Sequence, residues 1–145
     1  MIEISKNKKL LRRLKSKKVT LDEISDLIAE QSSLSYEQSY DDGYEEGARA
    51  GHEEGYQDGL KGKENMRDLV CEDNPRAAFY SELHDIFEAF RSGKMDYEEA
   101  ILCISRLDRN YHRAGFCLGF REGYEEYYSS GFDTGEEDGK KGVIV

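Results

Sequence analysis

The sequence predicts an all-α fold in which two long helices pack closely on each other, accompanied by shorter amphipathic helices. Three observations predict this fold class. Apolar side chains recur at helical spacing in four separate stretches of the chain. A single proline in 145 residues leaves room for long uninterrupted helices. Two stretches, 43–59 and 115–139, place glycine at every fourth position with one vacancy, at residue 127.

The N-terminal stretch differs sharply in charge from the rest of the chain. Residues 1–18 hold eight Lys/Arg and one Glu, whereas the remaining residues hold 13 Lys/Arg and 30 Asp/Glu. We expect 1–18 to form a basic arm or a short helix with Leu10, Leu11 and Leu14 on one face. Such an arm either binds RNA or another anionic surface, or folds onto the acidic body of its own chain.

Residues 19–145 are expected to form a single helical domain with three helices. The first ladder helix, 19–62, opens at a Thr20–Glu23 capping box. The middle helix, 74–92, opens at Asn74 and Pro75. The second ladder helix, 96–142, opens at the Asp96–Glu99 pair.

The glycine ladders predict close packing between helices. Each glycine costs a helix interior about 1 kcal/mol relative to alanine, so eleven of them cost roughly 10 kcal/mol. Close backbone contact with a second helix would offset this cost, as in small-xxx-small packing. Disorder is the alternative for such a charged stretch, but the strict spacing and the caps argue against it. The expected packing contacts are Gly43, Gly47, Gly51, Gly55, Gly59, Gly115, Gly119, Gly123, Gly131, Gly135 and Gly139.

Each ladder glycine is followed by a residue that is mostly aromatic, and then by polar or acidic positions. An aromatic beside each glycine can cover the partner helix, while the acidic positions face water. We expect partner contacts at one set of aromatic and acidic residues: Tyr44, Glu45, Glu46, Glu53, Glu54, Tyr56, Tyr124, Glu125, Glu126 and Tyr128.

The stretches GYEEGARAGHEEGYQDGLKG and GFCLGFREGYEEYYSSGFDTGEEDG resemble the repeated Gly-x-x-x motif of small eukaryotic adaptor proteins. The resemblance implies helix-pair association, which those adaptors use while delivering a client to the cytosolic iron–sulfur assembly machinery. The motif also resembles the glycine-repeat helix of the bacterial flagellar export-ATPase regulator FliH. It covers about a third of the chain, and here both ladders lie in one chain. The C-terminal recruitment signal of the adaptor family is not visible in KKGVIV.

The sequence contains no recognisable motif of catalysis or metal binding. The three histidines and three cysteines have no metal-ligand spacing, and no phosphate loop or nucleophile elbow occurs. We therefore expect no enzyme activity, no catalytic residues, no metal and no cofactor. Three widely spaced cysteines suggest a reducing cytoplasm without disulfides, with Cys103 and Cys117 in the core. No apolar run approaches the roughly 20 residues of a membrane span.

Two functions agree with these features. The first is a non-catalytic protein–protein interaction protein, an adaptor or inhibitor, built on the glycine ladders with acidic exposed faces. The alternative is an acidic nucleic-acid mimic that inhibits a DNA- or RNA-binding host or defence protein, as some phage proteins do. In both, the partner is a protein, basic or nucleic-acid-binding, and the acidic body does not bind DNA. The chain is expected to be a monomer or a homodimer, and the loop 62–74 with the following helix leaves room for the ladders to pair within one chain.

Overall fold

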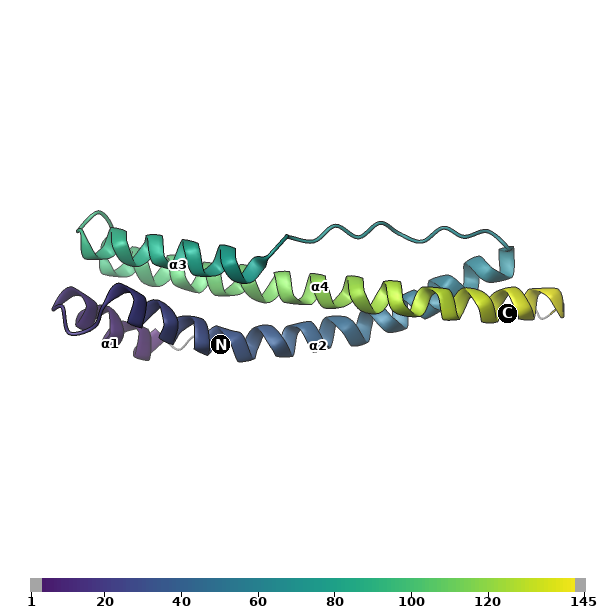
Figure 1. Cartoon of the computed structure of the whole chain (residues 1–145), viewed down its shortest axis with the longest axis horizontal. Helices are drawn as coiled ribbons and strands as arrows, with labels where there is room; N and C mark the ends of the chain where they lie inside the picture. The colour runs from purple at the N-terminus through teal and green to yellow at the C-terminus, as the bar shows by residue number, and fades with distance from the viewer. Residues whose placement is uncertain (1–3, 143–145) are drawn as a thin grey trace. The chain divides into compact units, whose positions relative to one another are not determined.

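The computed structural model describes residues 4–142 and confirms the all-α fold class. The described residues form four helices and no strand, and they are α1 (Ile4–Lys15), α2 (Leu21–Lys61), α3 (Pro75–Arg91) and α4 (Tyr97–Lys140). An extended segment joins α2 to α3 (Figure 1). None of the described helices is long and apolar enough to cross a membrane.

The helix starts are fixed by side chains that satisfy free backbone N–H groups. At α2, the Glu23 N–H donates to Thr20 Oγ1 at 3.1 Å and the Thr20 N–H donates to Glu23 Oε1 at 3.4 Å. Asn74 Oδ1 accepts from the Ala77 N–H at α3. At α4, Asp96 Oδ1 accepts from the Glu99 N–H at 2.9 Å, which lowers the pKa of the Asp96 carboxyl. These caps lie where the sequence predicts them.

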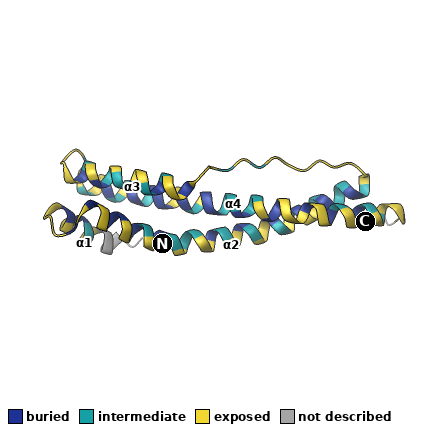
Figure 2. Cartoon of the chain, in the orientation of Figure 1, coloured by how far each residue is buried: buried dark blue, intermediate teal, exposed yellow. Residues whose placement is uncertain are grey.

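The chain divides into two compact units, and both α2 and α4 contribute to each. The first unit comprises residues 1–37 and 73–113, and the second comprises 38–72 and 114–145. The first unit has an ordinary apolar core (Figure 2). Its buried side chains come from all four helices and include Leu11, Leu14, Ile24, Ile28, Phe79, Leu83, Phe87, Phe90, Ile104 and Leu107.

The helix α1 packs its leucines into this core and turns its cations outward. Leu11 and Leu14 are buried, whereas Arg12 and Arg13 are exposed. The Lys15 ammonium lies 5.1 Å from the centre of the Phe90 ring. The N-terminal stretch is therefore a short helix that belongs to the first unit. Two leucines at helical spacing from buried apolar residues, Leu27 and Leu102, are exposed.

In the second unit, the C-terminal parts of α2 and α4 run parallel and pair through both glycine ladders. Gly43 faces Phe116, Gly47 faces Phe120 and Gly51 faces Tyr124, so the contacts advance in the same direction along both helices. The reverse set holds as well, because Gly119 faces Tyr40 and Gly123 faces Tyr44. The ladders therefore pair within one chain, and each helix offers its glycines to the other. The remaining contacts of this kind are Gly55–Tyr128, Gly59–Phe132, Gly131–His52, Gly135–Tyr56 and Gly139–Leu60.

The separation at these contacts leaves no room for a side chain. At nine of the glycines a Cβ would lie closer than 3.0 Å to backbone atoms of the facing helix, nearest in every case to a carbonyl oxygen. The hydrogen that replaces Cβ therefore points at that oxygen, which is the geometry of a Cα–H···O contact. Gly115, the remaining ladder glycine of α4, is also buried.

The vacancy at residue 127 has a counterpart on the other helix. The flanking contacts, Gly123 with Tyr44 and Gly131 with His52, place residue 127 opposite Ala48. Ala48 is the one position of the α2 series between Tyr40 and Tyr56 where the residue after the glycine is small. At this step the small residue lies on α2 and the tyrosine lies on α4, so Ala48 leaves room for the side chain of Tyr127.

Substitution of a ladder glycine by alanine tests the packing directly. We expect Gly47→Ala to lower the free energy of unfolding by about 1–3 kcal/mol, because its Cβ would overlap the Phe120 backbone. Gly139→Ala is the control, since its Cβ would lie 3.2 Å from Leu60 O, and the gain in helix propensity opposes that smaller strain. Urea unfolding followed by circular dichroism compares the two, and equal stability of both variants would contradict close packing.

Candidate binding surface

Tyrosines of the second unit reach across the helix pair and donate to carboxylates of the opposite helix. The Tyr56 hydroxyl donates to Asp138 Oδ2 at 2.8 Å, and the Tyr128 hydroxyl donates to Asp58 Oδ2 at 2.5 Å. Three further pairs of the same kind are Tyr40 with Glu122, Tyr44 with Glu126, and Tyr124 with Glu54. These hydrogen bonds connect the glycine ladders to the acidic positions of the repeat.

A single spacing rule describes all five pairs. The carboxylate lies three residues after the glycine that faces the tyrosine, so Tyr44 faces Gly123 and reaches Glu126. For two of the three phenylalanines in these series, the residue three positions after the facing glycine is not acidic. It is Ala50 for Phe120 and Gly62 for Phe132. Phe116 is the exception, because its place holds Glu46.

Three of these tyrosines, Tyr44, Tyr56 and Tyr128, have pKa values raised above the ordinary value. The hydrogen bond to Glu126 raises the pKa of Tyr44 to about 12. Burial, followed by the hydrogen bond to Asp58, raises the pKa of Tyr128 to about 12. The hydrogen bond to Asp138 likewise raises the pKa of Tyr56. Each hydroxyl is thus held in its neutral form as a donor.

The central part of the aromatic row of α4 is covered by the chain itself. We call Phe116, Phe120, Tyr124, Tyr128 and Phe132 the covered row, and the extended segment 62–72 the strap. The Asn65 N–H donates to the Tyr128 hydroxyl at 2.9 Å, and the Arg67 N–H donates to the Tyr124 hydroxyl at 3.0 Å. Under the strap, Tyr124 and Tyr128 are 0% and 1% exposed. Their oxygens therefore donate to a carboxylate and accept from the strap at once.

Arg67 is the side-chain anchor of the strap. Its guanidinium carbon lies 5.1 Å from the centre of the Tyr124 ring and 5.9 Å from that of Phe120. Its Nε and NH2 groups donate to the two carboxylate oxygens of Glu54 at 2.9 and 2.6 Å. The bidentate pair raises the pKa of the Arg67 guanidinium. One arginine thus combines a cation–π contact with an ion pair.

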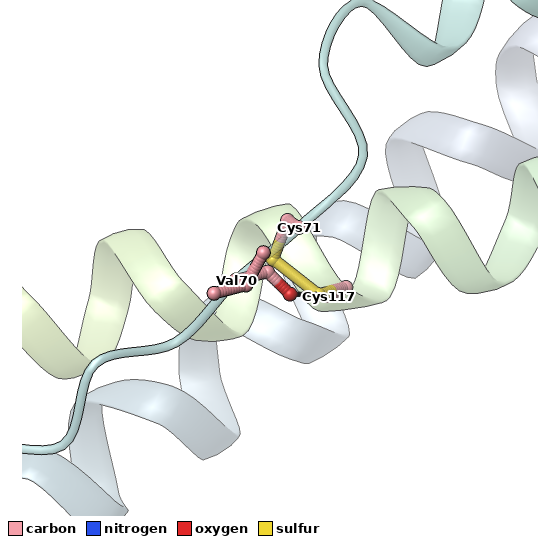
Figure 3. Close-up of a disulfide and its surroundings, with 3 residues drawn as sticks. All are labelled: Val70, Cys71 and Cys117. Atoms are coloured by element: carbon pink, nitrogen blue, oxygen red, sulfur yellow. Dashed lines mark hydrogen bonds between the residues drawn. A yellow bond between two sulfur atoms is a disulfide. The ribbon is translucent and has the colours of Figure 1, made fainter.

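A disulfide between Cys71 and Cys117 ties the end of the strap to α4 (Figure 3). The two Cα atoms lie 5.9 Å apart. The expectation of three free cysteines is therefore wrong, and so is the expectation that Cys117 lies in the core, because it is partly exposed. Wide spacing in the sequence did not separate the two residues in space, since the strap returns along α4. Cys103 is the free cysteine among the three, and it too is partly exposed and lies outside the apolar core where it was expected.

A second row, made of three residues of α2 and Tyr127 of α4, lies at the surface. We call Tyr44, Tyr127, His52 and Tyr56 the open row; Tyr127 belongs to it because it lies opposite Ala48. Tyr127 is 40% exposed, His52 is exposed, and Tyr44 and Tyr56 are partly exposed. The rings of Tyr44 and Tyr127 meet edge to face with centroids 6.4 Å apart. Exposed tyrosines of this kind are typical of binding surfaces.

The residues predicted to contact a partner divide into two groups. Tyr124, Tyr128 and Glu54 serve the packing of the strap, which differs from the expectation that they are available to a partner. Tyr44 and Tyr56 lie in the open row. The carboxylates at Glu45, Glu46, Glu53, Glu125 and Glu126 are exposed.

Net charge is confined to the second unit. Its residues include 17 acidic and 7 basic side chains, a formal charge of −10, whereas the first unit holds 14 of each. The basic stretch 1–18 is thus balanced by the acids of its own unit. Among the described residues, no group of three or more His, Cys, Asp or Glu side chains could hold a metal ion.

Sequence reasoning missed the strap and its anchors, Asn65, Arg67 and Cys71. The hydrogen bonds of Asn65 use the main chain, so no sequence pattern marks them. A signal did exist for the tyrosine–carboxylate pairs, because the acids recur three residues after the ladder glycines. Comparison with protein-family models, curated proteins and solved structures finds no match to this chain.

Alkaline pH should weaken the second unit. Because the folded-state pKa values of Tyr44 and Tyr128 lie above their ordinary 10.0, their contribution to stability is complete below about pH 10 and is lost as the pH rises toward 12. Thermal unfolding across this range should show a steeper fall for the native chain than for a Tyr44→Phe, Tyr56→Phe variant. Parallel falls for the two proteins would contradict the role of these hydrogen bonds.

Reduction of the disulfide should loosen the strap. The crosslink spans 46 residues, and the chain-entropy account assigns it up to about 4 kcal/mol. We expect Cys71→Ser to lower the unfolding temperature and to speed hydrogen exchange at the Asn65 and Arg67 amides. Cys103→Ser serves as the control, because Cys103 is free. Unchanged exchange at both amides in Cys71→Ser would show that the hydrogen bonds alone hold the strap.

Proposed function

We propose that this chain is a non-catalytic protein–protein interaction protein, an adaptor or an inhibitor. The observation that carries the proposal is the open row, a line of exposed or partly exposed aromatic side chains beside exposed carboxylates. Tyr127 is 40% exposed although it belongs to the close-packed part of the molecule. Tyrosine gives large contact area at low entropic cost, which favours its use in protein interfaces.

The glycine ladders support this function as a rigid base. Both ladders are occupied by each other within one chain, so their glycine faces are not available to a second subunit. We therefore propose a monomer that meets its partner through side chains outside the helix contact. The resemblance to Gly-x-x-x adaptors favours the adaptor role, with the difference that one chain supplies both ladders.

An acidic nucleic-acid mimic is the alternative function, and the charge distribution favours it. The whole formal charge of −10 lies in the second unit, and carboxylates such as Glu45, Glu53 and Glu125 are exposed along its helices. A track of this kind attracts the basic surface of a DNA- or RNA-binding protein. Binding of that type depends on salt, because exposed charges are screened.

Affinity capture from cell extract at two salt concentrations tests both functions. The bait is the full chain, with Tyr44→Ala, Tyr127→Ala as the variant bait, and bound proteins are quantified by mass spectrometry at about 0.05 M and 0.5 M salt. We expect partners that depend on the two tyrosines and survive high salt, because aromatic burial is weakly screened.

Two other results would change the assignment. Partners that are lost at high salt and displaced by duplex DNA, with no dependence on the tyrosines, would support the nucleic-acid mimic. If no protein distinguishes the native chain from the variant at either salt concentration, and none is displaced by DNA, the interaction function is wrong.

A further inference from the structure

We propose that the open row binds one extended, arginine-bearing segment of a partner protein, in the way that the covered row binds the strap. This inference rests on the proposed function, because it names the kind of segment that the second unit receives. The covered row supplies the template, since it shows which chain conformation and which side chain this type of surface accepts.

The strap fits the covered row because two residues of extended chain are about as long as four residues of helix. Asn65 and Arg67 are two residues apart, and their N–H groups meet tyrosine hydroxyls that are four residues apart on α4. Two residues of extended chain span about 6.6 Å. Four residues of helix rise about 6 Å. Alternate N–H groups of an extended chain therefore meet successive members of an aromatic row with period four.

The open row lies in the equivalent position on the other helix. The ladders face each other reciprocally, with Gly47 against Phe120 and Gly123 against Tyr44. This approximate two-fold relation places Tyr44 where the covered row has Phe120. The next place, that of Tyr124, holds Ala48 on α2, and there Tyr127 of α4 supplies the ring. His52 and Tyr56 then stand at the places of Tyr128 and Phe132. The phenol oxygens of Tyr44 and Tyr56 donate to carboxylates, as those of Tyr124 and Tyr128 do beneath the strap.

The open row also has the parts of an arginine site. Beneath the strap, the Arg67 guanidinium contacts two neighbouring rings and pairs with Glu54, which also accepts from a tyrosine. In the open row, Tyr44 and Tyr127 are neighbouring rings, and Glu126 accepts from Tyr44. Glu126 is exposed. An incoming guanidinium can therefore lie against the two rings and pair with this carboxylate.

The negative charge of the second unit favours a cationic segment over nucleic acid or a second copy of the chain. The second unit carries −10, so nucleic acid and the second unit of another copy are both repelled. The strap meets its row with an arginine, although it contains acidic residues of its own. A partner segment without those acids would gain further from the surrounding carboxylates, and its capture would depend partly on salt.

A nuclear magnetic resonance titration of the full chain tests the site at the level of residues. The probe is a capped peptide of strap residues 62–70 with Glu64→Gln and Asp68→Asn, which keeps Lys63 and Arg67 and omits the cysteine. We expect saturable shifts at the amides of Tyr44, His52 and Tyr127. The same peptide with Arg67→Ala should bind at least about tenfold more weakly.

Two protein variants separate the arginine site from general attraction by charge. Glu126→Gln should weaken binding of the peptide by about three- to tenfold, because it removes the carboxylate while the amide oxygen still accepts from Tyr44. Glu125→Gln removes the same charge one residue away, at a position of the repeat that has no tyrosine-accepting carboxylate, and should change binding less than about twofold.

Several results would overturn the inference. These are the absence of shifts, shifts confined to Asn65, Arg67 and the covered row, or equal effects of Glu125→Gln and Glu126→Gln. If the open row shifts with duplex DNA and not with the peptide, its occupant is nucleic acid. If it shifts with rising protein concentration and not with the peptide, its occupant is a second copy of the chain. If partners that are lost from the Tyr44→Ala, Tyr127→Ala chain are retained by a Glu126→Gln chain, the proposed function stands and this inference fails. If the titration succeeds but no partner is captured, the function fails.

Discussion

The second unit depends on one constraint, the approach of two helix backbones to direct contact. Glycine is required because the atom nearest to a built Cβ is a carbonyl oxygen of the facing helix, which cannot move aside as a flexible side chain would. The cost in helix propensity, about 1 kcal/mol per residue, is offset by dispersion and by Cα–H···O contacts of similar size. The contact also brings each tyrosine of the two series over the opposite helix, where its hydroxyl reaches a carboxylate. Tyrosine pairs, covered row and open row all follow from this approach.

The two units show different relations between sequence and stability. The first is held by an apolar core of the usual kind, with Leu83, Phe87 and Ile104 buried at helical spacing. In the second, burial comes from aromatic rings packed beside the glycine contacts. The tyrosine hydroxyls of those rings donate hydrogen bonds to carboxylates of the opposite helix. The acids that give this unit its charge therefore also serve its structure. Changing a carboxylate such as Asp58 or Glu54 alters both the packing and the surface potential.

The sequence was sufficient for the all-α fold, the helix starts and the closeness of the ladders. Period, caps and glycine spacing are local signals, and Thr20, Asn74 and Asp96 cap helices as expected. The burial of Tyr124 and Tyr128 was not predictable in the same way, because a segment without periodicity covers them through main-chain hydrogen bonds. The Cys71–Cys117 bond depended on the direction in which that segment returns. Local patterns do not contain that direction.

The exchange of Tyr127 and Ala48 bears on how the helices find their alignment. A ladder with a period of four looks the same after a slide of four residues, so glycine alone permits several alignments of α2 on α4. After such a slide Tyr127 would meet Tyr44 or His52 in place of Ala48, and Tyr124 would reach Ala50 or Asp58 in place of Glu54. Two bulky side chains would then collide at the step of Tyr127. In the slide that brings Tyr124 to Ala50, the buried Tyr124 hydroxyl would also lose its acceptor. The irregular positions of the repeat therefore favour one alignment of α2 on α4 over the others that glycine spacing alone would permit.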